Sequence, residues 1–181
     1  MNDNKITDFL HKLQNDYINL ELPYKLNILW SHIHWSRFYW SLNEEKYAIL
    51  NKGLINCALL ESSILFGRLL LEFIGIKHNK HGFVTMSKKY KDDILINDVF
   101  PTINLCSTEE VSLLNNRGHI LYLLMISSKR VAHNTFNDFG KTEIDRIHSA
   151  QELIHQIIEK MLPDISRENL LKYNELANMT T

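Results

Sequence analysis

The sequence predicts an all-α protein, a single-domain bundle of five or six helices. Apolar residues recur at helical spacing over most of the chain, and no stretch shows the clean period-two alternation of a half-buried strand. Only 6 Gly and 3 Pro occur among 181 residues, and no Gly/Ser/Pro-rich linker or internal repeat divides them. A chain of this length can bury one substantial core, so we expect one domain over residues 1–181.

The N-terminal third is expected to form two helices. Residues 5–20 place apolar side chains three and four apart, which is typical of an amphipathic helix. Pro23 is expected to stop this helix or to occupy the first turn of the next. In the second helix, 24–42, aromatic residues fall on more than one face, which indicates either a wide core helix or an interface. These aromatic residues are Trp30, Trp35, Phe38, Tyr39 and Trp40.

The most hydrophobic helix is expected between residues 44 and 76, with a break or kink at 51–53. Its second half carries Glu61, Arg68 and Glu72. Glu61 and Arg68 are seven residues apart and share a face, whereas Arg68 and Glu72 are one turn apart. Because an unpaired buried charge is costly, we expect these groups to be paired or to reach a polar cavity.

The middle of the chain, about 75–107, is expected to be irregular, with loops and short helical turns but no sheet. The run Ser107-Thr-Glu-Glu110 matches a capping box and predicts the start of a central helix over about 108–133. That helix is strongly apolar from Ile120 to Ile126.

Two further helices are expected after the central one. Thr142 is expected to cap the first of them, which carries one apolar stripe and which Pro163 ends. Ser166 is expected to cap a last short helix over about 167–178, whose polar end frays.

The composition is that of a soluble globular protein, and it limits the classes of partner that can be expected. A formal net charge of −1 gives no global basic field, so a nucleic acid would have to be held by a local patch. Cys57 and Cys106 form neither a CxxC pair nor a disulfide framework, which fits a reducing cytoplasm. No signal peptide is recognisable, and charged or polar residues interrupt every long apolar stretch, so no membrane partner is expected.

The histidines give no metal site, and we expect no metal and no cofactor. Two pairs are close in sequence, His32 with His34 and His78 with His81. The first pair points to different faces of a helix, and the second has no carboxylate or thiolate beside it. His148 and His155 are expected on the solvated side of their helix.

The strongest candidate for a functional site is the polar end of the central helix. Its residues are Ser127, Ser128, Lys129, Arg130, His133 and Asn134. Arg130 and His133 are three apart and lie on the same side of a helix. A guanidinium can hold a phosphate in bidentate fashion and an imidazole can move a proton near neutral pH, which are the requirements for cleaving RNA with its own 2′-OH. The alternative is a purely structural role, because cations, His and Asn are common at helix C-termini.

The segment KRVAHN, at the end of an apolar helix late in a small helical chain, resembles the C-terminal motif of HEPN (higher eukaryotes and prokaryotes nucleotide-binding) domains. The resemblance implies an R-x4–6-H motif in a four-helix bundle whose homodimer forms a metal-independent ribonuclease. Many such proteins serve toxin–antitoxin or other defence systems, so an antitoxin or defence subunit is an expected partner. Residues 58–73, ALLESSILFGRLLLEF, are also similar to the earlier long helix of some HEPN-like bacterial proteins. The resemblance covers a core over about 44–160, on which the helices at 5–42 pack.

The resemblance assigns a role to each residue of the candidate site. His133 would be the general acid or base, and Arg130 or Arg68 would stabilise the charge on the phosphorane. The residues expected to position the phosphate or to orient these groups are Asn134, Ser128, Lys129 and Glu61.

The sequence has no Arg at the motif's usual distance from His133, because Arg130 gives an R-x2-H spacing. Arg68 is expected to supply the guanidinium from the neighbouring helix. The alternative is a non-catalytic helical dimerisation or protein-interaction module that has lost the active-site Arg. A third interpretation is an internal small-molecule pocket lined by Arg68, Glu61 and His133.

Overall fold

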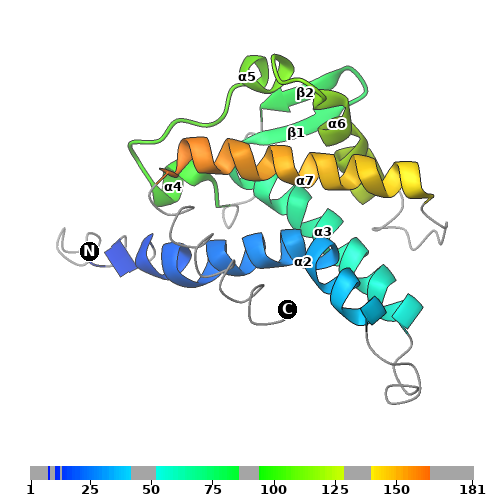
Figure 1. Cartoon of the computed structure of the whole chain (residues 1–181). Coiled ribbons are helices and arrows are strands. Elements are labelled where there is room, and N and C mark those ends of the chain that lie inside the picture. The colour runs from blue at the N-terminus through cyan, green and yellow to red at the C-terminus, as the bar shows by residue number, and fades with distance from the viewer. Residues whose placement is uncertain are drawn as a thin grey trace.

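The protein is predominantly helical, which confirms the all-α fold class (Figure 1). The computed structural model describes residues 8, 11–12, 14–41, 52–85, 94–128 and 140–163. Its elements are, in order, the π-helical turn η1 (Tyr17–Glu21), α2 (Leu22–Ser41), α3 (Lys52–Phe73), β1 (Ile76–Asn79), β2 (Gly82–Thr85), α4 (Ile96–Val99), α5 (Thr108–Ser112), α6 (Arg117–Ile126) and α7 (Lys141–Met161).

The helices form two groups on either side of α7. In Figure 1, α7 crosses the molecule, with α2 and α3 packed together below it and with the β1–β2 hairpin and α5 above it. α3 runs towards the hairpin, whereas α6 begins near α5 and runs away from it, so α3 and α6 are roughly antiparallel (Figure 1). This direction determines which parts of the two helices lie side by side.

α3 is the central helix of the core. A methyl group at Gly67 would lie 3.2 Å from both Leu29 of α2 and Leu123 of α6, so three helices meet at this glycine. The inward side of α3 is mainly apolar around it, with Ile64, Leu70 and Leu71 at 0% exposure. The same cluster includes residues from η1, α2, β1, α6 and α7 and forms one continuous core.

The N-terminal helix does not break at Pro23. Residues 14–16 continue through η1 into α2, and Pro23 lies in the first turn of α2. In the π turn before it, the Leu22 N–H donates to the Tyr17 carbonyl five residues back. A widened turn relieves the clash between a proline ring and the preceding turn, so the chain keeps its helical course.

The prediction that no sheet occurs between residues 75 and 107 is wrong. β1 and β2 form an antiparallel hairpin in which Ile76 pairs with Thr85 and Asn79 with Gly82. Gly82 has φ +126°, and the Asn79 side chain accepts a hydrogen bond of 2.7 Å from the His81 N–H. Four-residue strands are too short to show an alternation, so the turn chemistry was the only available signal.

The expected helix over 108–133 is divided in two. Its start is confirmed: the Glu110 N–H donates to Ser107 Oγ (3.0 Å) and the Ser107 N–H donates to Glu110 Oε2 (3.1 Å). α5 then ends after five residues, and Asn116, with φ +65°, turns the chain before α6 starts. Asparagine tolerates this left-handed conformation better than most residues, which is why the break falls there.

α7 begins two residues earlier than expected. Its N-cap is Gly140 rather than Thr142, and Glu143 Oε2 accepts a hydrogen bond of 3.1 Å from the Gly140 N–H. The helix ends at Met161, two residues before Pro163, as predicted. The predicted helix at 167–178 and the predicted helical residues 44–51 lie outside the described residues.

Among the described residues, one helix is long and apolar enough to cross a membrane by length and composition alone. It spans Gly53–Phe73, the main part of α3, and 33% of its most apolar window is buried in the fold. Central helices of soluble proteins pass the same test. Here the helix packs against α2, α6 and α7.

Candidate functional site

The predicted site begins directly after α6, at Ser127. The hydroxyls of Ser127 and Ser128 both donate to the Leu124 carbonyl, at 2.8 and 3.1 Å, so they are engaged with their own helix. The other predicted residues of this segment, Lys129, Arg130, His133 and Asn134, lie outside the described residues.

One carboxylate, that of Glu143, ties the start of α7 to α6. Glu143 Oε1 accepts a hydrogen bond of 2.7 Å from the Tyr122 hydroxyl of α6, and its Oε2 accepts from the Gly140 N–H. The guanidinium of Arg146 lies 4.1 Å from the centre of the Tyr122 ring. The start of α7 is therefore fixed against the middle of α6, and the predicted catalytic segment connects two helices that are packed together.

Arg68 is paired with Glu72 on its own helix. Arg68 Nε lies 2.7 Å from Glu72 Oε1, and both side chains are partly exposed. The contact uses Nε, so the terminal nitrogens of the guanidinium are not part of it. Glu61 is exposed two turns earlier on α3. The partner that the structure gives Arg68 is thus Glu72, and the expected pairing with Glu61 is not made within the helix.

The antiparallel course of α3 and α6 places Glu61, rather than Arg68, level with Ser128, the last residue described before the predicted catalytic segment. Leu123 lies opposite Gly67, so Ser128, five residues further along α6, lies opposite the first half of α3. At ~1.5 Å per residue, Arg68 is about 10 Å further from this level than Glu61 along the helix axis. The same copy of the chain therefore does not bring Arg68 to the end of α6.

The outward face of α3 carries exposed apolar residues at regular spacing. Positions 54, 58, 61, 65, 68 and 72 alternate in steps of four and three, the spacing of a helix–helix seam. Leu65 is 37% exposed, Leu54 63%, and the adjacent Leu69 44%. Glu61 lies four residues before Leu65 and Arg68 three residues after it. This set of residues is called the α3 seam below.

A pair of imidazoles joins α2 to α7 inside the protein. His32 Nδ1 and His148 Nε2 are 2.9 Å apart, and His32 is 3% exposed. Burial, and to a smaller extent the neighbouring His148, lowers the pKa of His32 from 6.5 to about 4, against the opposing effect of a hydrogen bond with Asn56 of α3. His32 is therefore neutral near pH 7, and one of the two rings donates to the other.

A second set of polar contacts continues along the inward side of α7. The Trp30 indole N–H donates to His155 Nδ1 (3.2 Å), and the Gln151 amide donates to the buried Ser63 hydroxyl (2.7 Å). Burial also lowers the pKa of His155.

The prediction that His148 and His155 lie on the solvated side of α7 is wrong, because both rings contact residues of α2. The spacing of positions 148, 151 and 155 by three and four residues would have indicated one inward stripe.

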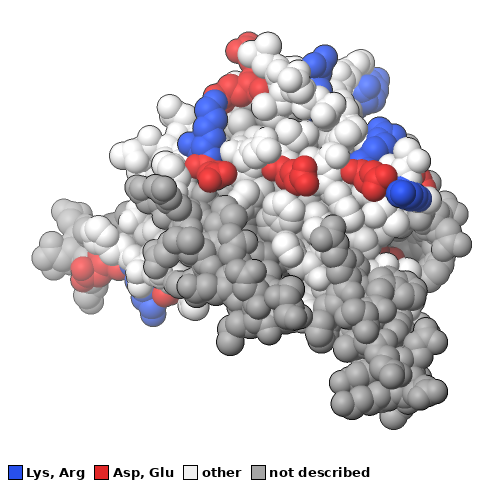
Figure 2. Space-filling view, viewed as in Figure 1, with Lys and Arg blue, Asp and Glu red and all other residues white. Residues whose placement is uncertain are grey.

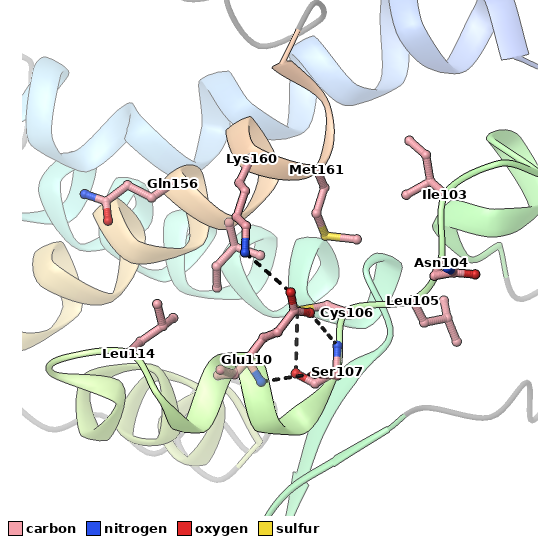
Figure 3. Close-up of a pocket in the computed structure, with 12 residues that line it drawn as sticks. Ile103, Asn104, Leu105, Cys106, Ser107, Glu110, Leu114, Gln156, Lys160 and Met161 are labelled. Carbon is pink, nitrogen blue, oxygen red and sulfur yellow. Dashed lines mark hydrogen bonds and ion pairs between the residues drawn. The ribbon is translucent and has the colours of Figure 1, made fainter.

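A cavity of about 750 Å³ lies between α7 and the segment 103–114 (Figure 3). Its wall is held by the Ser107 capping box and by a hydrogen bond of 2.9 Å from the Cys106 N–H to the Ile74 carbonyl. Lys160 of α7 reaches across to Glu110 of α5, with Nζ 3.4 Å from Oε1. Sequence reasoning missed this cavity because its two walls are about fifty residues apart in the chain.

The described residues contain no group of three or more His, Cys, Asp or Glu side chains that could hold a metal ion. Cys57 is exposed on α3, whereas Cys106 is buried. Burial raises the pKa of the Cys106 thiol to about 11, so it is protonated and unreactive near neutral pH.

Comparison of the chain with protein-family models, with curated proteins and with solved structures found no match. Its function is therefore argued from its own residues and their geometry.

Proposed function

We propose that the chain is a HEPN-like homodimer that binds RNA and cleaves it without a metal ion. His133 would transfer the proton, Arg130 would hold the phosphate, and Ser128, Lys129 and Asn134 would position it. The observation that carries the proposal is the α3 seam, in which Glu61 and Arg68 lie on either side of the exposed Leu65.

A two-fold axis near Leu65 makes the α3 seam self-complementary. In an antiparallel pair of α3 helices related by such an axis, Glu61 of one copy is level with residues 68–69 of the other. A negative charge then meets a positive charge twice, and the exposed leucines cover one another. Because Glu61 is level with the end of α6, the partner's Arg68 would lie nearer to that end, measured along the helix axis, than the chain's own Arg68 does. The dimer would thus supply the guanidinium that the R-x2-H spacing lacks.

Dimerisation is tested by size-exclusion chromatography with light scattering. Leu69→Glu buries a charge in the proposed interface, so it should convert a dimer into a monomer. Leu113→Glu is the matched control, because Leu113 is 84% exposed outside the seam, and this variant should remain dimeric. A monomeric wild-type protein, or a dimer that tolerates both changes equally, contradicts the proposed interface.

The charge pairing is tested by exchanging its members. Glu61→Arg alone should weaken the dimer because it faces the partner's Arg68 with a like charge. Adding Arg68→Glu in the same chain should restore it. If the double variant is no better than the single one, Glu61 and Arg68 do not meet across the interface.

Activity is tested on labelled single-stranded RNA in the presence of EDTA. We expect cleavage by the wild type, none by His133→Ala, and undiminished cleavage by the control variant His81→Ala, which changes an exposed histidine of the hairpin. Equal cleavage by the wild type and His133→Ala would exclude the proposed role of His133.

A second candidate is a non-catalytic helical dimerisation module. Acidic side chains are spaced along the outer face of α7, at Asp145, Glu152 and Glu159, and repel phosphate from that side of the molecule (Figure 2). The buried His32, which is neutral near pH 7, offers no positive charge to a phosphate either. A dimer that neither binds nor cleaves RNA at moderate salt would favour this candidate.

A further inference from the structure

The cavity between α7 and the segment 103–114 has the character of a ligand site. Its volume of about 750 Å³ lies within the ~300–1,000 Å³ that is typical of small-molecule pockets. Apolar side chains dominate its lining, and the labelled ones on the side of Met161 are Ile103 and Leu105 (Figure 3). The cavity is remote from the α3 seam, so it needs a separate explanation.

The polar centre of the cavity is a carboxylate held in a fixed position. Glu110 Oε2 accepts the Ser107 N–H at 3.1 Å and closes the capping box of α5. This backbone hydrogen bond lowers the pKa of Glu110, so the group is ionised at neutral pH. Oε1 is directed across the cavity, where it meets the ammonium group of Lys160 at 3.4 Å (Figure 3).

The two members of this ion pair differ in how firmly they are held. Both side chains are exposed, Lys160 by 76% and Glu110 by 54%, but Glu110 is tied to the backbone by its cap, whereas the Lys160 ammonium ends a long flexible stem. Exposed pairs of this kind contribute ~0–1 kcal/mol, so Lys160 can swing away at little cost. When Lys160 moves away, the cavity is apolar with one fixed anionic acceptor. In the unliganded protein this acceptor already binds an ammonium group, that of Lys160.

We propose that this cavity binds an amphipathic amine, with the protonated amine on Glu110 in place of Lys160 and the apolar body among Ile103, Leu105 and Met161. The ligand's ammonium group takes over the contact with Glu110 that Lys160 gives up, and the exposed Lys160 ammonium is solvated by water. The apolar body supplies the favourable free energy of burial.

The test uses three probes that each contain a straight chain of eight carbon atoms: n-octylammonium, n-octanol and octanoate, whose eighth carbon is that of the carboxylate. Binding is followed by NMR of the Met161 methyl group, which reports from the cavity itself, and by calorimetry. We expect octylammonium to bind most tightly and octanoate least tightly. The proposal is overturned if no probe shifts the Met161 resonance at millimolar concentration, or if octanoate binds as tightly as octylammonium.

Two variants isolate the carboxylate. Glu110→Gln removes the charge and keeps the cap, since Gln also closes a capping box. It should weaken octylammonium by about two- to fivefold and leave octanol unchanged. Lys160→Gln removes the internal competitor and should strengthen octylammonium binding by a similar factor. If neither variant changes the ratio of octylammonium to octanol affinity, Glu110 does not recognise the amine.

Discussion

The two longest described helices, α3 and α7, are alike on the inside and opposite on the outside. Both bury a continuous apolar stripe in the same core. The outer face of α7 carries charged residues every seven positions, whereas the outer face of α3 leaves leucines in solvent. Water solvates the charged outer face of α7 favourably. The exposed apolar face of α3 is instead characteristic of a helix that packs against a partner. The comparison explains why α3 has the composition of a membrane span in a globular fold.

Truncating a core side chain on the inward side of either helix should destabilise the protein to a similar extent. Leu70→Ala on α3 and Ile154→Ala on α7 each truncate a side chain with 0% exposure and should lower the free energy of unfolding by about 2–5 kcal/mol. Urea denaturation followed by circular dichroism measures both. A loss below about 1 kcal/mol for either would show that this helix is not part of the common core.

The polar part of the inward side of α7 makes the fold sensitive to acid. His32 binds a proton with a pKa of about 4 when folded and 6.5 as its ordinary value, so the unfolded chain takes up more protons between these values. Stability is therefore complete above about pH 6.5 and decreases as the pH falls towards 4, by roughly 3 kcal/mol.

Unfolding curves at pH 7, 5.5 and 4 measure this dependence, and His32→Gln is the comparison. That variant removes the titrating group beside His148 and Asn56, so its stability should depend less on pH over this range. An unchanged pH dependence would assign the effect to other groups, of which His155 is the first candidate because burial lowers its pKa too.

The smallest effect concerns reactivity rather than stability. Cys57 is exposed on α3 and Cys106 is buried with a pKa raised to about 11. A thiol reagent at pH 8 should modify Cys57 quickly and Cys106 only after unfolding, with no change in the midpoint of thermal denaturation. Cys57→Ser should remove the fast phase. Two fast phases would place Cys106 in a mobile part of the wall around the cavity.

The sequence predicted the helical class and several boundaries because these depend on local patterns. The Ser107 capping box and the end of α7 before Pro163 were read correctly for this reason. The β1–β2 hairpin and the break at Asn116 depend on single residues with positive φ, which leave almost no periodic signal. The cavity and the His32–His148 pair depend on contacts between distant segments, and no local pattern can supply those.

The candidate site shows the same division. Residue types alone drew attention to Arg68 and Glu61. Only the antiparallel course of α3 and α6 shows that Glu61, and not Arg68, is level with the end of α6. The pairing of Arg68 with Glu72 follows from one-turn spacing and was among the expected alternatives.

Gly67 has a consequence for how the chain becomes a folded unit. Leu29 and Leu123 approach this residue from segments that are far apart in sequence, so neither the N-terminal helices nor the later ones complete the centre of the protein alone. A fragment that begins at residue 44 would leave one side of that crossing open to water. α2 is therefore a structural requirement of the domain rather than an extension of it, and the chain should gain its stability in a single cooperative step.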